Sequence, residues 1–134
     1  MQKLRWSITG QLARGRRPGV ERKRGSLVPK AVVDAWIKEA KEAGIRSVIC
    51  LLDERQLRFY EKLPANLVSY YRSQGLNARH IRAPNMRHPP LSDQQLKQVW
   101  SAYGRLEKPV LVHCSAGIGR TRSAVRHIKE RIGN

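Results

Sequence analysis

The chain lacks several features that mark common classes of protein. It has only two cysteines in 134 residues, Cys50 and Cys114, which is too few for the disulfide framework of a small secreted domain. No apolar run approaches the roughly 20 residues that a membrane-spanning helix needs, and the charged N-terminus has no apolar signal-peptide segment. We therefore expect a cytoplasmic protein with no membrane span.

Acidic residues are scarce as well. Lys and Arg number 27 and Asp and Glu only 10, which gives a net charge of +17. A field of this sign attracts anions such as phosphoproteins, phospholipid headgroups or nucleic acid. No aromatic side chains alternate with the dense basic residues near the N-terminus, as a base-stacking surface would require. Nucleic acid or another polyanion is one class of partner that fits this charge, and a solvated basic surface is the other interpretation.

Apolar segments of strand length alternate with segments of helical spacing along the chain. We predict strands at 5–9, 11–13, 46–52, 77–83 and 110–112. We predict helices ending at Gly44, over 56–75 with a break near Pro64, over 92–106, and from Gly119 onward. This alternation predicts an α/β fold, a single domain over residues 1–134 with a central, mostly parallel sheet flanked by helices.

Turn and cap residues separate these elements. Residues 14–26 combine glycines and a proline with several basic side chains, so we predict a basic loop there. Ser26 is expected to cap the first long helix, with Pro29 in its first turn. Ser92 and Gln95 have the spacing of a capping box for the helix 92–106.

The most informative stretch covers residues 110–121. Three apolar residues predict a buried strand that leads directly into Cys114, and residues 115–119 form a loop with two glycines. Glycines let successive backbone N–H groups turn inward as a nest for an anion, and the N-terminus of the following helix adds partial positive charge. That field also favours the thiolate of Cys114, the nucleophilic form. Arg120 offers a planar fork for two phosphate oxygens.

This stretch resembles the Cys-x5-Arg signature of the protein tyrosine phosphatase superfamily, and it is most similar to that of the small atypical dual-specificity phosphatases. The resemblance implies that Cys114 is the nucleophile and forms a phosphocysteine. It implies that Thr121 donates a hydrogen bond to the Cys114 sulfur and that His113 fixes the loop. The implied phosphate-binding residues are Ser115, Ala116, Gly117, Ile118, Gly119 and Arg120. No metal and no cofactor are implied.

The sequence departs from the family pattern at the general acid. Family members carry Pro-Asp in the loop after the strand that corresponds to 77–83, and this chain has Pro84-Asn85 there. An asparagine delivers no proton, and general acid catalysis is typically worth about 10²–10⁴-fold. Three other residues are candidates for the role: Asp53, Glu54 and Asp93. Asp93 is also explained as part of a helix N-terminus, where negative charge is favourable.

The asparagine leaves three functions open. A phenol, with a pKa of about 10, leaves more readily than an alkyl alcohol, so phosphotyrosine in a phosphorylated protein is favoured over phosphoserine or phosphothreonine. A phosphate leaving group needs no acid, which fits an RNA 5′-triphosphatase or phosphatase of the same superfamily. A weakly active module that binds phosphorylated ligands is the third alternative. We take the phosphotyrosine phosphatase as the first prediction.

Further expectations concern residues around the loop. The family commonly has a glutamate that orients the loop arginine, and Glu54 is the candidate. Cys50 lies in the predicted strand 46–52, next to the strand that leads into Cys114. Some relatives pair a nearby thiol with the nucleophile in a reversible disulfide, and a buried core cysteine is the alternative. Four basic residues are expected near the anion site and favour a multiply charged substrate: Arg82, Arg87, His88 and Arg122. The family usually has glycine at the last of these positions.

Overall fold

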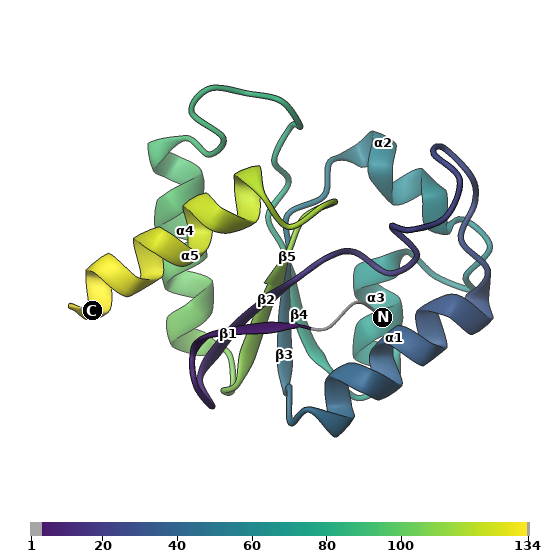
Figure 1. Cartoon of the computed structure of the whole chain (residues 1–134), viewed down its shortest axis with the longest axis horizontal. Coiled ribbons are helices and arrows are strands. Elements are labelled where there is room, and N and C mark those ends of the chain that lie inside the picture. Colours follow the sequence, from purple (N-terminus) through teal and green to yellow (C-terminus); the bar gives the residue numbers. More distant parts are fainter. Residues whose placement is uncertain (1–3, 134) are drawn as a thin grey trace.

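A five-stranded sheet in the order β1-β2-β5-β3-β4 lies at the centre of the structure, a computed structural model that describes residues 4–133 (Figure 1). The strands are β1 (Arg5–Ile8), β2 (Leu12–Gly15), β3 (Ser47–Cys50), β4 (Asn77–His80) and β5 (Val110–His113). β1 is antiparallel to β2, and β2, β5, β3 and β4 run parallel to one another. The prediction of a mostly parallel sheet is confirmed.

Helices cover both faces of this sheet, as predicted (Figure 1). One face carries α1 (Lys30–Glu42) and α3 (Leu67–Ser73), together with the short helices α2 (Glu54–Leu57) and η1 (Arg58–Tyr60). The other face carries α4 (Asp93–Arg105) and α5 (Gly119–Ile132). Each face therefore has its own apolar core, and the sheet separates the two cores.

The central strand β5 shows why its sequence is an unbroken apolar run. Leu111 packs into the core formed with α1 and α3, whereas Val110 and Val112 pack into the core formed with α4 and α5. All three side chains are fully buried. A strand covered on both faces needs an apolar side chain at every position. Because β5 is the middle strand, between β2 and β3, Cys114 lies just beyond the carboxyl end of the centre of the sheet.

Some element boundaries differ from the predicted ones. Ser26 does not cap α1, because its hydroxyl donates to the Lys23 carbonyl at 2.6 Å and the N-cap residue is Pro29. The loop predicted over 14–26 begins later, because residues 14 and 15 complete β2. The predicted helix 56–75 is divided into α2, η1 and α3. The capping box of α4 is confirmed by reciprocal bonds between Ser92 and Gln95, at 3.1 and 2.8 Å.

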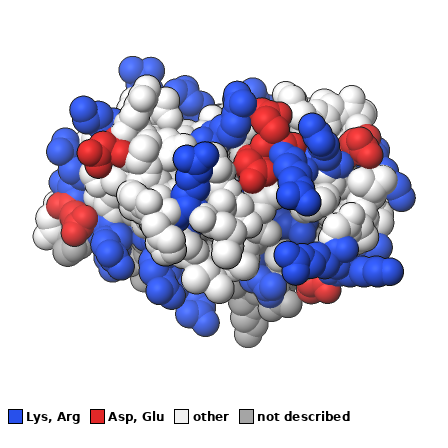
Figure 2. Space-filling model, turned by 90° about the horizontal axis from the view of Figure 1, so that it is seen from above, with Lys and Arg blue, Asp and Glu red and all other residues white. Residues whose placement is uncertain are grey.

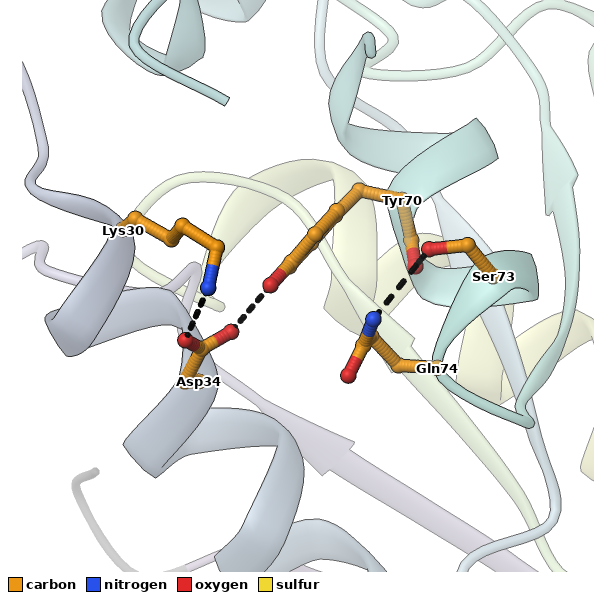
Figure 3. A network of polar contacts seen from close by, with 5 residues as sticks. All are labelled: Lys30, Asp34, Tyr70, Ser73 and Gln74. Atoms are coloured by element: carbon orange, nitrogen blue, oxygen red, sulfur yellow. Dashed lines mark hydrogen bonds and ion pairs between the residues drawn. The ribbon is translucent and has the colours of Figure 1, made fainter. Parts of the chain in front are cut away.

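Polar contacts join α1 to α3 on the exposed side of their shared core (Figure 3). Lys30 Nζ lies 2.9 Å from Asp34 Oδ2, and the Tyr70 hydroxyl of α3 donates to the other oxygen of Asp34. Ser73 Oγ donates to the Tyr70 carbonyl at 2.7 Å and accepts from Gln74 Nε2 at 3.4 Å. The bonds from Tyr70 and Lys30 hold the pKa of Asp34 below its ordinary value. This network holds α3 in place, and α3 contributes a side chain to the site described below.

The carboxyl ends of the parallel strands lie together at the top of Figure 1, where β5 leads into α5 and β3 leads into α2. In sheets covered on both faces, ligands bind outside these ends. No helix within residues 4–133 is long and apolar enough to cross a membrane. The loops at this edge of the sheet are therefore where a ligand site is expected.

Candidate active site

The loop between β5 and α5 presents a continuous row of backbone donors. Within residues 4–133, no N–H group from Ser115 to Thr121 donates to a protein acceptor, and the first helical bond of α5 runs from Arg122 N to Ile118 O at 3.1 Å. Cys114 opens this loop, and only 3% of it is exposed. Converging N–H groups at a helix N-terminus form an anion site. The arrangement therefore suits a phosphoryl group held next to the Cys114 sulfur.

Gly117 allows this loop to lie against the end of β2. Its φ of +77° is in the left-handed region, and a Cβ built on it would lie 2.8 Å from the carbonyl oxygen of Gly15. No other residue type fits that position without moving one of the two backbones. A glycine at position 117 is thus required by both its torsion angle and its packing.

Arg17 holds the start of the loop from the other side. It is buried, with 8% of its surface exposed, and its backbone N–H donates to the Ser115 carbonyl at 3.0 Å. Its Nε donates to Ser115 Oγ at 3.1 Å, and its Nη1 donates to the Tyr60 hydroxyl at 3.2 Å. The guanidinium also lies over the Phe59 ring, 4.9 Å from its centroid. This role of Arg17 could not be predicted from the sequence, because Arg17 is one of many cations in the predicted basic loop.

Arg120 is buried and is anchored through one end of its guanidinium. Its Nη1 donates to the Leu51 carbonyl at 3.0 Å, to Gln56 Oε1 at 2.9 Å and to the Ala83 carbonyl at 2.8 Å. Neither Nε nor Nη2 has a protein acceptor among the described residues. Those two donors lie on one edge of the planar guanidinium, an arrangement that suits two oxygens of an anion such as phosphate.

The residue that orients Arg120 is Gln56, and the prediction of Glu54 is wrong. Glu54 is exposed and lies 3.4 Å from Arg82 as a surface ion pair. Gln56 is buried because it completes the capping box of α2 with Asp53, and its amide oxygen then reaches Arg120. The spacing of Asp53 and Gln56 was a signal that could have identified this arrangement.

His113 connects the loop to α3. Its Nδ1 lies 3.0 Å from the Cys114 carbonyl and its Nε2 lies 2.9 Å from the Tyr71 hydroxyl. A carbonyl only accepts, so Nδ1 carries the hydrogen and Nε2 accepts from Tyr71. Burial lowers the pKa of His113 to about 4, and the charges of Arg17 and Arg120 act in the same direction. His113 is therefore neutral near pH 7 and acts on the loop by holding the Cys114 backbone.

Thr121 does not make the expected bond. Its hydroxyl is buried and has no hydrogen-bond partner in the described part of the chain, so the predicted donation to the Cys114 sulfur is not formed. Nor does Thr121 cap α5, whose N-cap residue is Ile118. A buried hydroxyl without a partner is costly, and Thr121 follows Arg120 directly at the N-terminus of the helix.

A cavity of about 510 Å³ opens beside the loop at the carboxyl ends of the strands. Its lining residues are Arg17, Arg24, Gly25, Asp53, Arg55, Gln56, Phe59, Asn85 and Ser115. Asn85, at the position where the family carries the general acid, donates its backbone N–H to Asp53 Oδ2 at 3.4 Å. Glu54 does not line this cavity, and Asp93 lies in the first turn of α4 as expected. Of the three candidate acids, Asp53 is the one beside the loop.

The four basic residues expected near the anion site do not form one cluster. Arg82 is paired with Glu54, whereas Arg122 lines a different cavity beside the loop. Figure 2 views the molecule from the edge of the sheet that carries the loop, and it shows basic side chains spread across this face with few acidic ones between them. The positive charge is therefore distributed around the loop in several groups.

Cys50 lies in β3, next to β5, and forms no disulfide with Cys114. It faces His113 in the register of β3 and β5, and both Cys50 and Cys114 are free thiols. Cys50 is fully buried, and burial raises its pKa to about 12. No group of three or more His, Cys, Asp or Glu side chains within residues 4–133 is arranged to hold a metal ion.

Comparison with protein-family models and with curated proteins gives no match. Solved structures do match. The active form of Tk-PTP is 17% identical with a TM-score of 0.55, over 97% of this chain and 84% of that one. Kinase associated phosphatase, with serine in place of its catalytic-site cysteine, is 17% identical with a TM-score of 0.61, over 87% of this chain and 65% of that one. PTPMT1 in complex with PI(5)P is 14% identical with a TM-score of 0.54, over 90% of this chain and 78% of that one. This chain therefore shares its α/β fold with these solved phosphatases.

Proposed function

We propose that the protein is a cysteine-dependent phosphatase that hydrolyses phosphotyrosine in protein substrates, with phosphoserine and phosphothreonine as poorer substrates. The observation that carries the proposal is the row of unpaired N–H groups from Ser115 to Thr121 beside Cys114, together with the unpaired end of Arg120. A phosphoryl group held by these donors would lie next to the sulfur. The match to solved phosphatases is consistent with this chemistry.

The reaction has two steps. In the first, the Cys114 thiolate attacks phosphorus, a P–S bond forms, the P–O bond to the phenol breaks, and the phenolate oxygen takes up a proton. In the second, water attacks phosphorus, the P–S bond breaks, and inorganic phosphate leaves with the thiolate restored. Charge in both transition states lies on the equatorial oxygens, where the loop N–H groups and Arg120 stabilise it.

We assign the proton transfer to Asp53. Asn85 has no acidic proton to give, whereas Asp53 lines the same cavity as Ser115 and is held there by Gln56 N at 2.8 Å and Asn85 N at 3.4 Å. Asp53 lines the cavity beside the loop, and in its protonated form it would be placed to deliver a proton to a leaving group bound there. Phosphotyrosine suits a site whose acid is not at the usual position, because a phenol leaves more easily than an alkyl alcohol.

The test compares leaving groups. Wild-type protein should hydrolyse a phosphotyrosine peptide and nitrophenyl phosphate, and Cys114→Ser should abolish both activities. Asp53→Asn should reduce kcat for the phosphotyrosine peptide by about 10²-fold and have a much smaller effect on nitrophenyl phosphate, whose leaving group needs little protonation. Glu54→Gln is the matched control and should change neither rate. Hydrolysis that survives Cys114→Ser would overturn the proposed phosphatase, and equal losses for both substrates in Asp53→Asn would remove its role as the acid.

Asn85 also favours a second function, the removal of phosphate from RNA 5′ ends, because a phosphate leaving group needs no acid. That function requires release of the γ-phosphate from triphosphate-ended RNA at a much higher rate than phosphate from phosphotyrosine. A phospho-ligand-binding module requires affinity for a phosphotyrosine peptide with almost no turnover of either substrate. The same protein preparation therefore distinguishes all three functions.

A further inference from the structure

A second cavity borders the loop between β5 and α5, and it is distinct from the cavity that Asp53 lines. It measures about 320 Å³ and shares the loop residues Ala116, Gly117 and Ile118 as one wall. Its other lining residues are Gly15 and four arginines: Arg5, Arg14, Arg16 and Arg122. None of the residues between 4 and 133 that line it is acidic. A substrate bound at the loop is therefore flanked by a concave surface of strongly positive charge.

This cavity continues along α5. A neighbouring cavity of about 490 Å³ shares Arg5, Arg14 and Arg122 and adds Arg126 and Lys129; among the described residues that line it, Glu130 is the one acidic side chain. We call the two together the arginine groove. Its six cations are Arg5, Arg14, Arg16, Arg122, Arg126 and Lys129.

The cations of the arginine groove are held close together without compensation. Arg5 and Arg14 lie directly opposite each other in the antiparallel register of β1 and β2, where like charges destabilise a sheet. Arg122, Arg126 and Lys129 have the spacing of one face of α5. None of the six side chains forms an ion pair with another residue between 4 and 133. The chain thus maintains an unfavourable cluster of charge that an anionic ligand would relieve.

We propose that the arginine groove binds an acidic stretch that flanks the phosphorylated residue of a protein substrate. This proposal rests on the proposed phosphatase function and extends it to the choice of substrate. Acidic side chains on the substrate would meet the groove while the phosphotyrosine occupies the loop, because the loop forms the wall between them. Ion pairs of this kind increase affinity and the rate of encounter.

The dimensions of the groove favour an extended peptide over a compact anion. A single phosphate would be saturated by the three arginines that both cavities share, whereas Arg122 to Lys129 extend the charge along about two turns of α5, or about 10 Å. That length corresponds to about three residues of an extended chain. Apolar side chains lie at the edge of the groove as well: Trp6 is 37% exposed and Ile118 is 59% exposed. A peptide offers side chains to both, which a small phosphate does not.

The experiment measures binding of two fluorescent phosphotyrosine peptides to the Cys114→Ser protein by anisotropy. One peptide carries a run of Asp and Glu beside the phosphotyrosine, and the other carries Asn and Gln at the same positions. We expect the acidic peptide to bind about tenfold more tightly at low salt. The ratio should fall close to one in Arg14→Gln/Arg122→Gln and also in Arg126→Gln/Lys129→Gln, which changes only the surface of α5. It should be unchanged in Lys97→Gln/Arg105→Gln, which removes the same charge from α4. Equal affinities in the protein with an intact groove, or an unchanged ratio in both groove variants, would overturn the proposal.

Two further arms separate this proposal from the proposed phosphatase function. Binding of an unphosphorylated acidic peptide, weakened by the groove substitutions, supports the groove even when the protein hydrolyses no aryl phosphate. Hydrolysis of aryl phosphate with no preference for the acidic peptide retains the phosphatase and overturns the groove. Vesicles of phosphatidylcholine and phosphatidylserine form the last arm: groove-dependent binding to them without any preference between the peptides would mean that the occupant is a lipid surface, and the peptide proposal would be wrong.

Discussion

Two sets of arginines lie around the loop between β5 and α5, and they differ in what they contact. Arg17 and Arg120 are buried and donate to carbonyl, amide and hydroxyl oxygens of the chain. Arg5, Arg14 and Arg122, at the surface, have no such partner among the described residues. The first set supports the loop, and one guanidinium edge of Arg120 has no acceptor among the described residues. The second set is available to whatever anion approaches from outside.

The difference shows that the basic residues behind the net charge of +17 have two separate roles, one inside the fold and one at its surface. A buried cation is tolerated only where hydrogen bonds replace its hydration, so burial of an arginine indicates a structural or catalytic task. An exposed cation needs no such compensation and contributes mainly to the external field. The comparison can be tested by replacing members of the two sets in matched pairs.

Replacement of Arg120 should have the largest effect. We expect Arg120→Ala to reduce kcat/KM for an aryl phosphate by at least about 10³-fold, because it removes the fork that binds the phosphoryl oxygens. Arg122→Ala, two residues along the same helix, should change the same quantity by less than about threefold, since an exposed charge contributes little to a small substrate. Similar losses in the two variants would mean that burial does not separate the sets.

The buried set also affects His113, and this gives a dependence of stability on pH. Burial, together with Arg17 and Arg120, lowers the pKa of His113 to about 4, whereas in the unfolded chain it titrates at about 6.5. As pH falls from about 6.5 to about 4, the unfolded chain binds a proton that the folded chain does not, so the free energy of unfolding should decrease by about 3 kcal/mol. Urea unfolding at a series of pH values measures this change.

The control for this effect is His113→Asn, measured over the same pH range. The variant keeps every other titrating group, including Asp34 with its lowered pKa, so the difference between the two curves isolates His113. The difference should narrow as pH falls, because only the wild-type protein loses stability through His113. Parallel curves would show that the pKa of His113 is the same in the folded and the unfolded chain, and would contradict the lowered pKa.

Replacement of Arg17 tests the structural role of the buried set directly. Arg17→Ala removes its bonds to Ser115 and Tyr60, and we expect the free energy of unfolding to fall by about 2 kcal/mol. Arg16→Ala, the adjacent position, should change it by less than about 0.5 kcal/mol, because the Arg16 side chain lies in the arginine groove. The backbone carbonyl of Arg16, which accepts from Trp36 at 3.0 Å, remains in both variants. A larger loss of unfolding free energy in Arg16→Ala than in Arg17→Ala would show that Arg16, and not Arg17, has the structural role.

The smallest effect is expected in the opposite direction. Arg5→Gln removes one of two like charges that face each other across β1 and β2, so it should raise the free energy of unfolding by a few tenths of a kcal/mol at low salt, on the order of a cross-strand pair. High salt should abolish the gain, because screening already weakens the repulsion. Destabilisation by this substitution would show that Arg5 has a structural partner and does not belong to the exposed set.

The sequence predicted those parts of the fold and site whose cause is local. Three such features depend on residues close in sequence and are present in the structure: the strand before Cys114, the left-handed turn at Gly117 and the capping box of α4. The roles of Arg17 and Gln56 were missed because their partners, Ser115 and Arg120, are 98 and 64 positions away. Only the folded chain brings such residues together.

The error over Glu54 has the same origin. A carboxylate near the end of β3 was a reasonable partner for Arg120, but the turn of α2 directs position 56 inward and position 54 outward. The prediction that Ser26 caps α1 was wrong for a different reason. The Ser26 hydroxyl donates to the nearby Lys23 carbonyl, and Pro29 is the N-cap residue of α1. The preference of serine for helix N-caps does not show whether its hydroxyl caps a helix or bonds to a nearby backbone carbonyl.

The contacts of the loop also determine when it can form during folding. Ser115 is held by Arg17 from the N-terminal part of the chain, and Arg120 is held by groups that follow β3 and β4. Every one of these contacts closes a long stretch of chain, and contacts of that kind are made late and together. Enzymatic activity should therefore be regained on refolding in a single phase with the last recovery of native fluorescence, and a partly folded chain that lacks the docked β1–β2 hairpin should have none.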